Sequence, residues 1–212
     1  MNADIFQDSA LIYDYEFNQI MDFVLQCYHL MLKKYQGKQI ENNENKIRNR
    51  LYKDFLNSNQ TRQLIDIFPC RFECECAEID TQYKEIGYTD IKVLTTISLS
   101  NSDAYYIIEC KRIDGSRHLN NEYIKEGVFR FVDVLKYPSY NNVCGMIGFV
   151  VKEIDTDKNI QNLNEILIEV SSPAPLKLIE QSALGRYTSI HTKTNNKPLK
   201  VSHLMLDYSS IV

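Results

Sequence analysis

Apolar residues at helical spacing predict two helices in the first quarter of the chain. Between about residues 16 and 35, positions three and four apart are apolar throughout, the pattern of an amphipathic helix with one buried face. Gly37 is expected to end this helix, because glycine readily adopts the left-handed conformation found just past helix ends. A second helix is expected from about 41 to 56, where apolar residues are spaced by four at Ile47, Leu51 and Phe55.

Farther along, the pattern changes to one typical of strands. Phe72, Cys74 and Cys76 alternate with polar positions, and the segment 89–97 also alternates between two faces. Residues 105–108 are Tyr-Tyr-Ile-Ile, a dense apolar run expected of a strand buried on both faces. Three strands are therefore predicted in succession.

The second half of the chain alternates helix and strand. A helix is expected from about 121 to 136, ended by Pro138, and residues 143–151 form an apolar run typical of a buried strand. A strand, a helix and a second buried strand make a crossover unit, so the strands on either side of this helix should be parallel. The remaining predicted elements are a helix at about 159–170 and two short strands near 187–192 and 199–206.

This order of elements predicts an α/β fold: a mixed central β-sheet flanked by helices, with two helices at the N-terminal end. The chain of 212 residues has only five prolines and seven glycines, and no linker stands out. A single domain, 1–212, is expected, with an N-terminal helical part (1–60), a core (61–155) and a C-terminal helix with strands (156–212). A chain of this length buries roughly 70% of its unfolded surface, enough for a core without staples.

Composition predicts a cytoplasmic protein without a membrane partner. Hydrophobic residues make up 44% and charged residues 25% of the sequence. No apolar run approaches the roughly 18 residues that a membrane helix needs, and the first eight residues lack the layout of a signal peptide. The six cysteines are accordingly expected to be reduced thiols.

Charge is unevenly distributed along the chain. The formal net charge is −4, which argues against a binder held by bulk positive charge. Residues 33–62 nevertheless carry eight basic against three acidic side chains, and residues 66–90 carry seven acidic against two basic ones. This arrangement could mean that the basic segment binds phosphates and the acidic segment binds a metal ion. The alternative is two solvated faces of opposite sign.

The sharpest chemical feature is two acids and a lysine at the ends of consecutive predicted strands. Asp90 lies at the start of one strand, and Glu109 and Lys111 lie at the end of the next. Residues two apart in a strand project to the same face, and pairing of the two strands would bring Asp90 beside them. Two carboxylates offer oxygen ligands to Mg²⁺. The lysine could act on the attacking water and stabilise charge developing on phosphorus.

At these residues the sequence resembles the PD-(D/E)xK nuclease superfamily, which has the restriction-endonuclease-like fold. Asp90 takes the place of the first acid of that motif, Glu109 the second and Lys111 the lysine, while Thr89 stands where the motif usually has proline. By topology the resemblance covers about residues 41–151. It implies a nuclease that acts on DNA and uses Mg²⁺, or Mn²⁺ in its place, with Asp90 and Glu109 as metal ligands.

The resemblance also implies another acid from the preceding helix. Glu44, three residues before Ile47, is the better candidate, and Glu41 lies about one turn earlier. The alternative for either residue is an ordinary acid at a helix N-terminus, stabilised by the helix dipole.

Basic side chains that could contact DNA phosphates lie on two predicted helices. On the second helix they are Lys46, Arg48, Arg50 and Lys53. On the helix after the Glu-x-Lys strand, Arg130 and Tyr123 could reach a phosphate. The alternatives there are a Glu126–Arg130 pair at i, i+4 and a packed tyrosine.

Other motifs give weaker signals. Cys70, Cys74 and Cys76 invite a zinc interpretation, but no second pair of cysteines has zinc-site spacing, and small buried side chains explain them as well. Ser189 and His191 do not make a triad without a placed third member.

Two functions follow from the sequence. The first is a metal-dependent DNA nuclease that works in restriction, phage defence or repair. The alternative is a catalytically inactive module of the same fold that binds nucleic acid or a protein partner. All three motif residues are present, which favours the enzyme. The net negative charge predicts modest DNA affinity for one chain, so a homodimer or a partner protein is expected.

Overall fold

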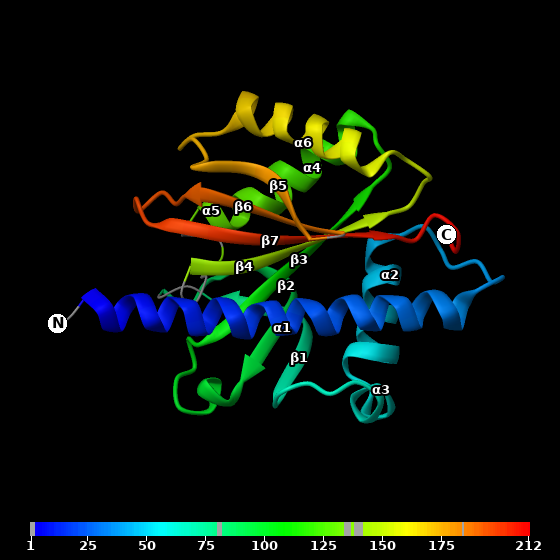
Figure 1. The fold of residues 1–212 in the computed structure, drawn as a ribbon, viewed down its shortest axis with the longest axis horizontal. Coiled ribbons are helices and arrows are strands. Elements are labelled where there is room, and N and C mark those ends of the chain that lie inside the picture. Colours follow the sequence, from blue (N-terminus) through cyan, green and yellow to red (C-terminus); the bar gives the residue numbers. More distant parts are fainter. Residues whose placement is uncertain (1–2, 80–81, 134–136, 138–141, 184) are drawn as a thin grey trace.

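The computed structural model describes residues 3–79, 82–133, 137, 142–183 and 185–212, which form an α/β fold around one seven-stranded mixed sheet (Figure 1). The strand order is β1-β2-β3-β4-β7-β6-β5. The strands are β1 (Cys70–Ile79), β2 (Glu85–Thr95), β3 (Tyr105–Ile113), β4 (Val143–Val150), β5 (Lys177–Ala183), β6 (Arg186–Thr192) and β7 (Pro198–Asp207).

Parallel pairing is confined to the middle of the sheet. β3 pairs with β4 and β4 pairs with β7 in parallel, whereas the pairs toward both edges are antiparallel. Parallel strands are expected to be covered on both faces, and all eight residues of β4 are buried. The parallel β3–β4 pair confirms the crossover predicted from the sequence.

The helices cover both faces of this sheet. They are α1 (Ala3–Tyr35), α2 (Glu44–Leu51), α3 (Asn59–Leu64), α4 (Arg117–Tyr123), α5 (Phe129–Val132) and α6 (Thr156–Val170). Two π-helical turns, η1 (Tyr52–Leu56) and η3 (Ile124–Val128), extend α2 and join α4 to α5, and a 3-10 turn, η2 (Thr96–Leu99), follows β2.

Two hydrophobic clusters, one on each face, hold the layers together. On one face, α1 and α2 bury residues such as Phe17 and Ile47 against Ile91 and Ile108 of the sheet. On the other, residues of α4, α5 and α6 pack with Ile107 and its neighbours. Figure 1 shows α1 crossing one side of the sheet and α4 and α6 on the other.

Helix α1 lies very close to the middle of the sheet. A Cβ atom added to Gly145 of β4 would come within 2.9 Å of the Phe17 ring and 3.1 Å of Ile108. Glycine at this position therefore allows the helix to pack on the strand. Two polar contacts tie α1 to β7: the Tyr28 hydroxyl donates to the Asp207 carbonyl oxygen at 2.8 Å, and Lys200 pairs with Asp14 at 2.6 Å.

Several boundaries differ from the predictions. Helix α1 begins at Ala3 rather than near residue 16. Helix α2 begins at Glu44 rather than at 41, because the Asn43 side chain accepts a hydrogen bond from the Lys46 amide and caps the helix there.

The helix expected at about 121–136 starts earlier than predicted. The Ser116 side chain caps α4, which begins at Arg117. Residues 134–136 and Pro138, the predicted end of this helix, lie outside the described residues.

Two elements were not predicted from the sequence. Helix α3 has only six residues, too few to show a helical period. Strand β5 lies at an edge of the sheet, and Ile179 is its single buried residue, so its sequence carries no alternating pattern. No described helix combines the length and the apolar character that a membrane crossing requires.

A chain of buried polar side chains joins β6, β7 and α4. The Ser189 hydroxyl lies 2.7 Å from His191 Nε2 and 2.8 Å from His203 Nε2, and the Tyr123 hydroxyl lies 2.8 Å from His203 Nδ1. All four side chains are almost fully buried. Burial lowers the pKa of His191 to about 4 and that of His203 to about 3, a shift to which His191 also contributes. Both imidazoles are therefore neutral in the folded protein at neutral pH.

These histidines predict a loss of stability in mild acid. Their folded pKa values lie below the unfolded value of 6.5, so stability present above pH 6.5 is lost as the pH falls toward 4. At pH 5 each histidine should lower the free energy of unfolding by roughly 2 kcal/mol. Urea unfolding at pH 7 and pH 5 should show a smaller pH effect in His191→Asn and His203→Asn than in the wild type. The exposed His29→Asn is the control, and equal pH effects in all four proteins would contradict the prediction.

Candidate active site

The candidate site lies in a fork where β2 and β3 part. The β2–β3 ladder ends at the pair Ile91–Ile108, just before Asp90 and Glu109. Beyond this pair, among the described residues, β2 is paired only with β1 and β3 only with β4. Two backbone amides of β3 face acidic side chains there instead of a strand. Asp90 Oδ2 accepts the Cys110 N–H at 2.8 Å, and Glu44 Oε2 accepts the Arg112 N–H at 3.0 Å.

Helix α2 supplies side chains to this fork from its first turns. Glu44 is its first residue, and Arg48 follows at i+4 on the same face of the helix. Ile47 and Leu51 hold the helix in the core on the α1 face of the sheet. The apolar spacing of α2 thus fixes where its polar side chains meet β2 and β3.

Three acids and three cations interlock in the fork. Lys111 Nζ lies 2.8 Å from Glu109 Oε1 and 3.4 Å from Glu44 Oε1. Arg130 Nη1 lies 3.0 Å from the same Glu109 oxygen, and Arg48 Nη1 pairs with Asp90 Oδ1. The structure therefore brings together Asp90, Glu109, Lys111 and Glu44, the four candidate catalytic residues.

Burial changes the acidity of this cluster. Glu109 is 1% exposed, and its burial, with the nearby charge of Asp90, raises its pKa to about 7 despite Lys111 and Arg130. Burial acts to lower the pKa of Lys111, but the charges of Glu109 and Glu44 outweigh it, and the net direction is upward. Lys111 is therefore a buried ammonium at neutral pH, and Glu109 is a carboxyl that titrates near neutrality. Shifts of this kind are concentrated at functional sites.

Glu75 of β1 is a further acid at the site that the sequence did not reveal. Its carboxylate lies 2.5 Å from Arg48 Nη2, so Arg48 bridges Glu75 and Asp90. The Glu75 backbone has φ of 54°, the left-handed conformation that side chains other than glycine disfavour. Nothing in the run Glu73 to Glu78 distinguishes this acid from its neighbours, since an acidic residue in a strand usually faces solvent.

The predicted phosphate contacts divide into two groups. Lys46 and Lys53 are exposed and Arg50 is half-buried, and their spacing places them along one side of α2 and its π turn. Arg48 is 3% exposed and held by Asp90, so the structure does not place it at the surface with the other three basic residues. Its position one residue after the buried Ile47 turns it inward toward the acids of β2 and β1.

The structure also shows the contacts of Arg130 and Tyr123 in the helical segment after β3. Arg130 is partly exposed, and its guanidinium contacts Glu109 and the Tyr137 hydroxyl, at 3.0 and 2.8 Å, rather than Glu126. Glu126 lies within the π turn η3, which alters the i, i+4 spacing between Glu126 and Arg130. Tyr123 is packed in the core against His203, as the alternative had it. Glu41 is exposed, so Glu44 is the helix acid at the site.

The donor atoms suit a hard divalent cation. Glu109 Oε2 is a buried oxygen without a hydrogen-bond partner, and Asp90 supplies a second carboxylate close by. Mg²⁺ is commonly bound by one or two carboxylates with water and phosphate oxygens completing its shell. Among the described residues no group of three or more His, Cys, Asp or Glu is arranged to hold a metal, so the zinc interpretation of the cysteines has no support in the described structure.

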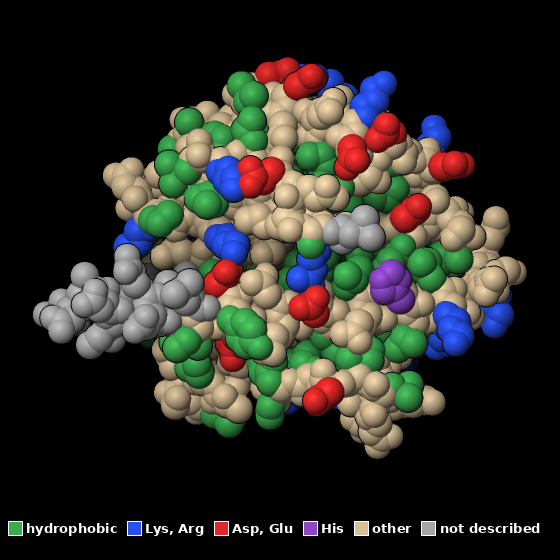
Figure 2. All heavy atoms as spheres, viewed as in Figure 1, with side chains coloured by type: hydrophobic (Ala, Val, Ile, Leu, Met, Phe, Trp, Pro, Cys, Tyr) green, Lys and Arg blue, Asp and Glu red, His purple; other side chains and the backbone are tan. Residues whose placement is uncertain are grey.

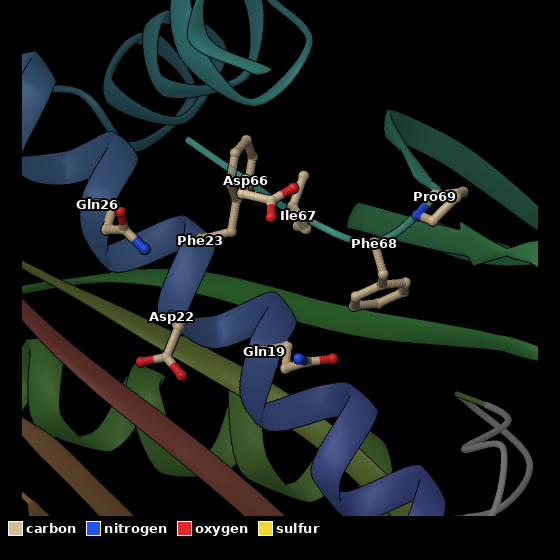
Figure 3. Close-up of a pocket in the computed structure, with 8 residues that line it drawn as sticks. All are labelled: Gln19, Asp22, Phe23, Gln26, Asp66, Ile67, Phe68 and Pro69. Atoms are coloured by element: carbon tan, nitrogen blue, oxygen red, sulfur yellow. The ribbon is translucent and has the colours of Figure 1, made fainter. Parts of the chain in front are cut away.

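A large groove lies elsewhere, between α1 and the segment before β1. Its volume is about 580 Å³. Figure 3 shows its lining residues: Gln19, Asp22, Phe23, Gln26, Asp66, Ile67, Phe68 and Pro69. None of them belongs to the charged cluster. Two of the polar residues are acids, which would repel a nucleic-acid backbone.

Glu44 and Glu41 offer a matched test of the site geometry. Glu44→Ala removes the acceptor of the Arg112 amide and one partner of Lys111, and it should lower the free energy of unfolding by about 1–3 kcal/mol. Glu41→Ala, at an exposed position, should change it by less than about 0.5 kcal/mol. Urea unfolding measures both. Equal effects of the two changes would contradict the placement of Glu44.

No protein-family model, no curated protein and no solved structure matches this chain. The function of the site is therefore inferred from its own geometry and chemistry.

Proposed function

We propose that the protein is a Mg²⁺-dependent nuclease that hydrolyses phosphodiester bonds in DNA and has the restriction-endonuclease-like fold. The observation that carries the proposal is the convergence of Asp90, Glu109 and Lys111 with Glu44 in the fork between β2 and β3. The order of α2, the antiparallel strands β1 to β3, the helix pair α4–α5 and the parallel strand β4 supports it.

Asp90 and Glu109 would hold the metal, because both present carboxylate oxygens at the fork and one of these is a buried oxygen without a partner. A bound Mg²⁺ would polarise a phosphate oxygen and lower the pKa of a coordinated water. Both acids lie next to the last pair of the β2–β3 ladder, Ile91–Ile108, so their separation is set before any ligand arrives, which favours a preorganised site.

Lys111 would stabilise negative charge that develops at phosphorus. Its ammonium is buried beside Glu109, where water screens its field little. Glu44 would act on Lys111 rather than on the substrate, since its two oxygens engage Lys111 and the Arg112 amide. The ion pair between Glu44 and Lys111 would hold the lysine beside Glu109.

DNA would contact the basic side of α2. Lys46, Arg50 and Lys53 point to this role by their spacing and exposure. Figure 2 shows acidic and basic side chains interspersed on the α1 face of the molecule, which offers no broad positive surface there. Modest affinity and a homodimer or partner protein fit this distribution. Restriction, phage defence and repair are the settings in which such an enzyme would act.

A catalytically inactive nucleic-acid- or protein-binding module is the second candidate. The observation in its favour is that arginine side chains pair with both candidate metal ligands, Arg48 with Asp90 and Arg130 with Glu109. Opposite charges that pair with one another satisfy the buried acids without a metal ion. Catalysis assays separate the two candidates.

Substitutions of Lys111 distinguish the proposed nuclease from the inactive binding module. Lys111→Ala should leave Mn²⁺ and DNA binding largely intact and lower cleavage about 10²- to 10³-fold, the usual effect of removing one transition-state donor. Lys111→Arg should not restore full activity, because a guanidinium has a different shape and holds its proton. The assay uses supercoiled plasmid, linear duplex and single strands with Mg²⁺, Mn²⁺ or EDTA, and the exposed Lys158→Ala is the control.

Two outcomes would contradict this proposal. Wild-type cleavage by Lys111→Ala would remove the role given to the lysine. Absence of cleavage by the wild type on every substrate and metal would favour the binding module.

The basic side of α2 gives a second prediction. Replacing Lys46, Arg50 and Lys53 with Gln should weaken binding to all DNA sequences and reduce the slope of log K against log salt by about 2 to 3, since each phosphate contact contributes about 0.9. Fluorescence anisotropy at several salt concentrations measures the slope. Replacing the exposed Lys152, Lys158 and Lys197 in the same way makes a control of equal charge. Equal slopes in the two variants would place the DNA elsewhere.

A further inference from the structure

Arg48 forms an ion pair with Asp90, one of the two proposed metal ligands. Its guanidinium is 3% exposed, and its two terminal nitrogens engage different acids: Nη1 pairs with Asp90 and Nη2 with Glu75. The two acids differ in environment. The Asp90 side chain is 12% exposed, whereas the Glu75 side chain is 54% exposed. Arg48 therefore links the buried carboxylate of Asp90 to the solvent-exposed carboxylate of Glu75.

The Glu75 backbone indicates that this position is specialised. Cys74 and Cys76 pair with β2 on either side of it, yet Glu75 itself adopts φ of 54°. Residues other than glycine hold such a conformation only where the surrounding structure determines it, and such positions cluster at functional sites. The result is an acid that leaves the regular alternation of β1 and meets Arg48.

Arg48 and a divalent metal would compete for the same atoms. Asp90 Oδ2 already accepts the Cys110 amide, and Asp90 Oδ1 is held by Arg48. A cation that binds Asp90 would lie close to the positive charge of Arg48 at Oδ1, so the two cations repel one another and compete for this carboxylate. Glu109 presents no such barrier at Oε2, which has no hydrogen-bond partner. The competition is thus confined to Asp90.

We propose that Arg48 is a built-in counter-cation that competes with divalent metal for Asp90, and that Glu75 holds Arg48 when Asp90 is released. The inference rests on the proposed metal-dependent function and adds a regulator of metal affinity to it. Without metal, Arg48 neutralises a buried acid that would otherwise be unpaired. With metal, its second partner keeps the guanidinium at the mouth of the site, where it no longer opposes the bound cation.

Opposite effects of two substitutions test this arrangement. Calorimetric Mn²⁺ titration should show about tenfold tighter binding in Arg48→Gln, because the competing cation is gone. It should show several-fold weaker binding in Glu75→Gln, because Arg48 then has Asp90 as its remaining partner. In the Arg48→Gln, Glu75→Gln double variant the Glu75 change should have little further effect, since it acts through Arg48.

Matched controls separate a specific competition at Asp90 from a general effect of changing the charge near the site. Lys46→Gln removes a cation from the same helix, and Glu73→Gln removes an acid two residues away on β1; both should leave Mn²⁺ affinity close to that of the wild type. If Arg48→Gln does not fold, Arg48→Met serves instead, because its uncharged side chain replaces the buried stem of the arginine without a competing cation, and tighter binding is again expected.

Each outcome decides a different claim. Unchanged or weaker Mn²⁺ binding in the Arg48 variants, with binding by the wild type, overturns the competition. An equal effect of Glu75→Gln with and without Arg48 overturns the role of Glu75. Absence of Mn²⁺ binding in the wild type and in every Arg48 variant, with no difference from an Asp90→Asn, Glu109→Gln variant, overturns the proposed metal-dependent function itself.

Discussion

The parting of β2 and β3 after the Ile91–Ile108 pair is the constraint on which the candidate site depends. Where two strands separate, the amides along the freed edge lose their partners, and buried amides without acceptors are costly. Here the acceptors are carboxylates, Asp90 for Cys110 and Glu44 for Arg112. The acids therefore complete the backbone hydrogen bonding of β3. The same contacts hold them at fixed positions for chemistry.

Concentrating acids in this way creates a charge problem that the fork solves locally. Lys111, Arg48 and Arg130 each contact at least one of the three acids, so that the cluster is close to balanced. Burial still raises the pKa of Glu109, which indicates that the balance is incomplete at that carboxyl.

Most of the fold and the centre of the site could be predicted from the sequence, because both follow from strong local patterns. The apolar runs identified β3 and β4, and the spacing of Asp90, Glu109 and Lys111 predicted that these three side chains lie at one place in the sheet. Arg48 and Arg130 were expected to contact phosphates rather than the acids of the site, and Glu75 was not identified; each difference has a physical reason. A basic residue on a helix is expected in solvent unless an acid on another element meets it, and a left-handed backbone at glutamate has no signature in sequence. Arg130 was expected at a phosphate, with a Glu126 pair as the alternative; its contact with Glu109 was not expected, because the π turn that contains Glu126 cannot be read from the residues.

The contacts of α1 with β7 have a consequence for the order of folding. Tyr28 and Asp14 in the first helix meet Asp207 and Lys200 in the seventh strand, across more than four fifths of the chain. Contacts between such distant segments form late, because a long loop must be closed first. During synthesis, the apolar face of α1 would therefore emerge well before β7, its partner in the sheet. A nascent chain would carry the part of this long amphipathic helix that packs on β7 uncovered until residues 198–207 had been made.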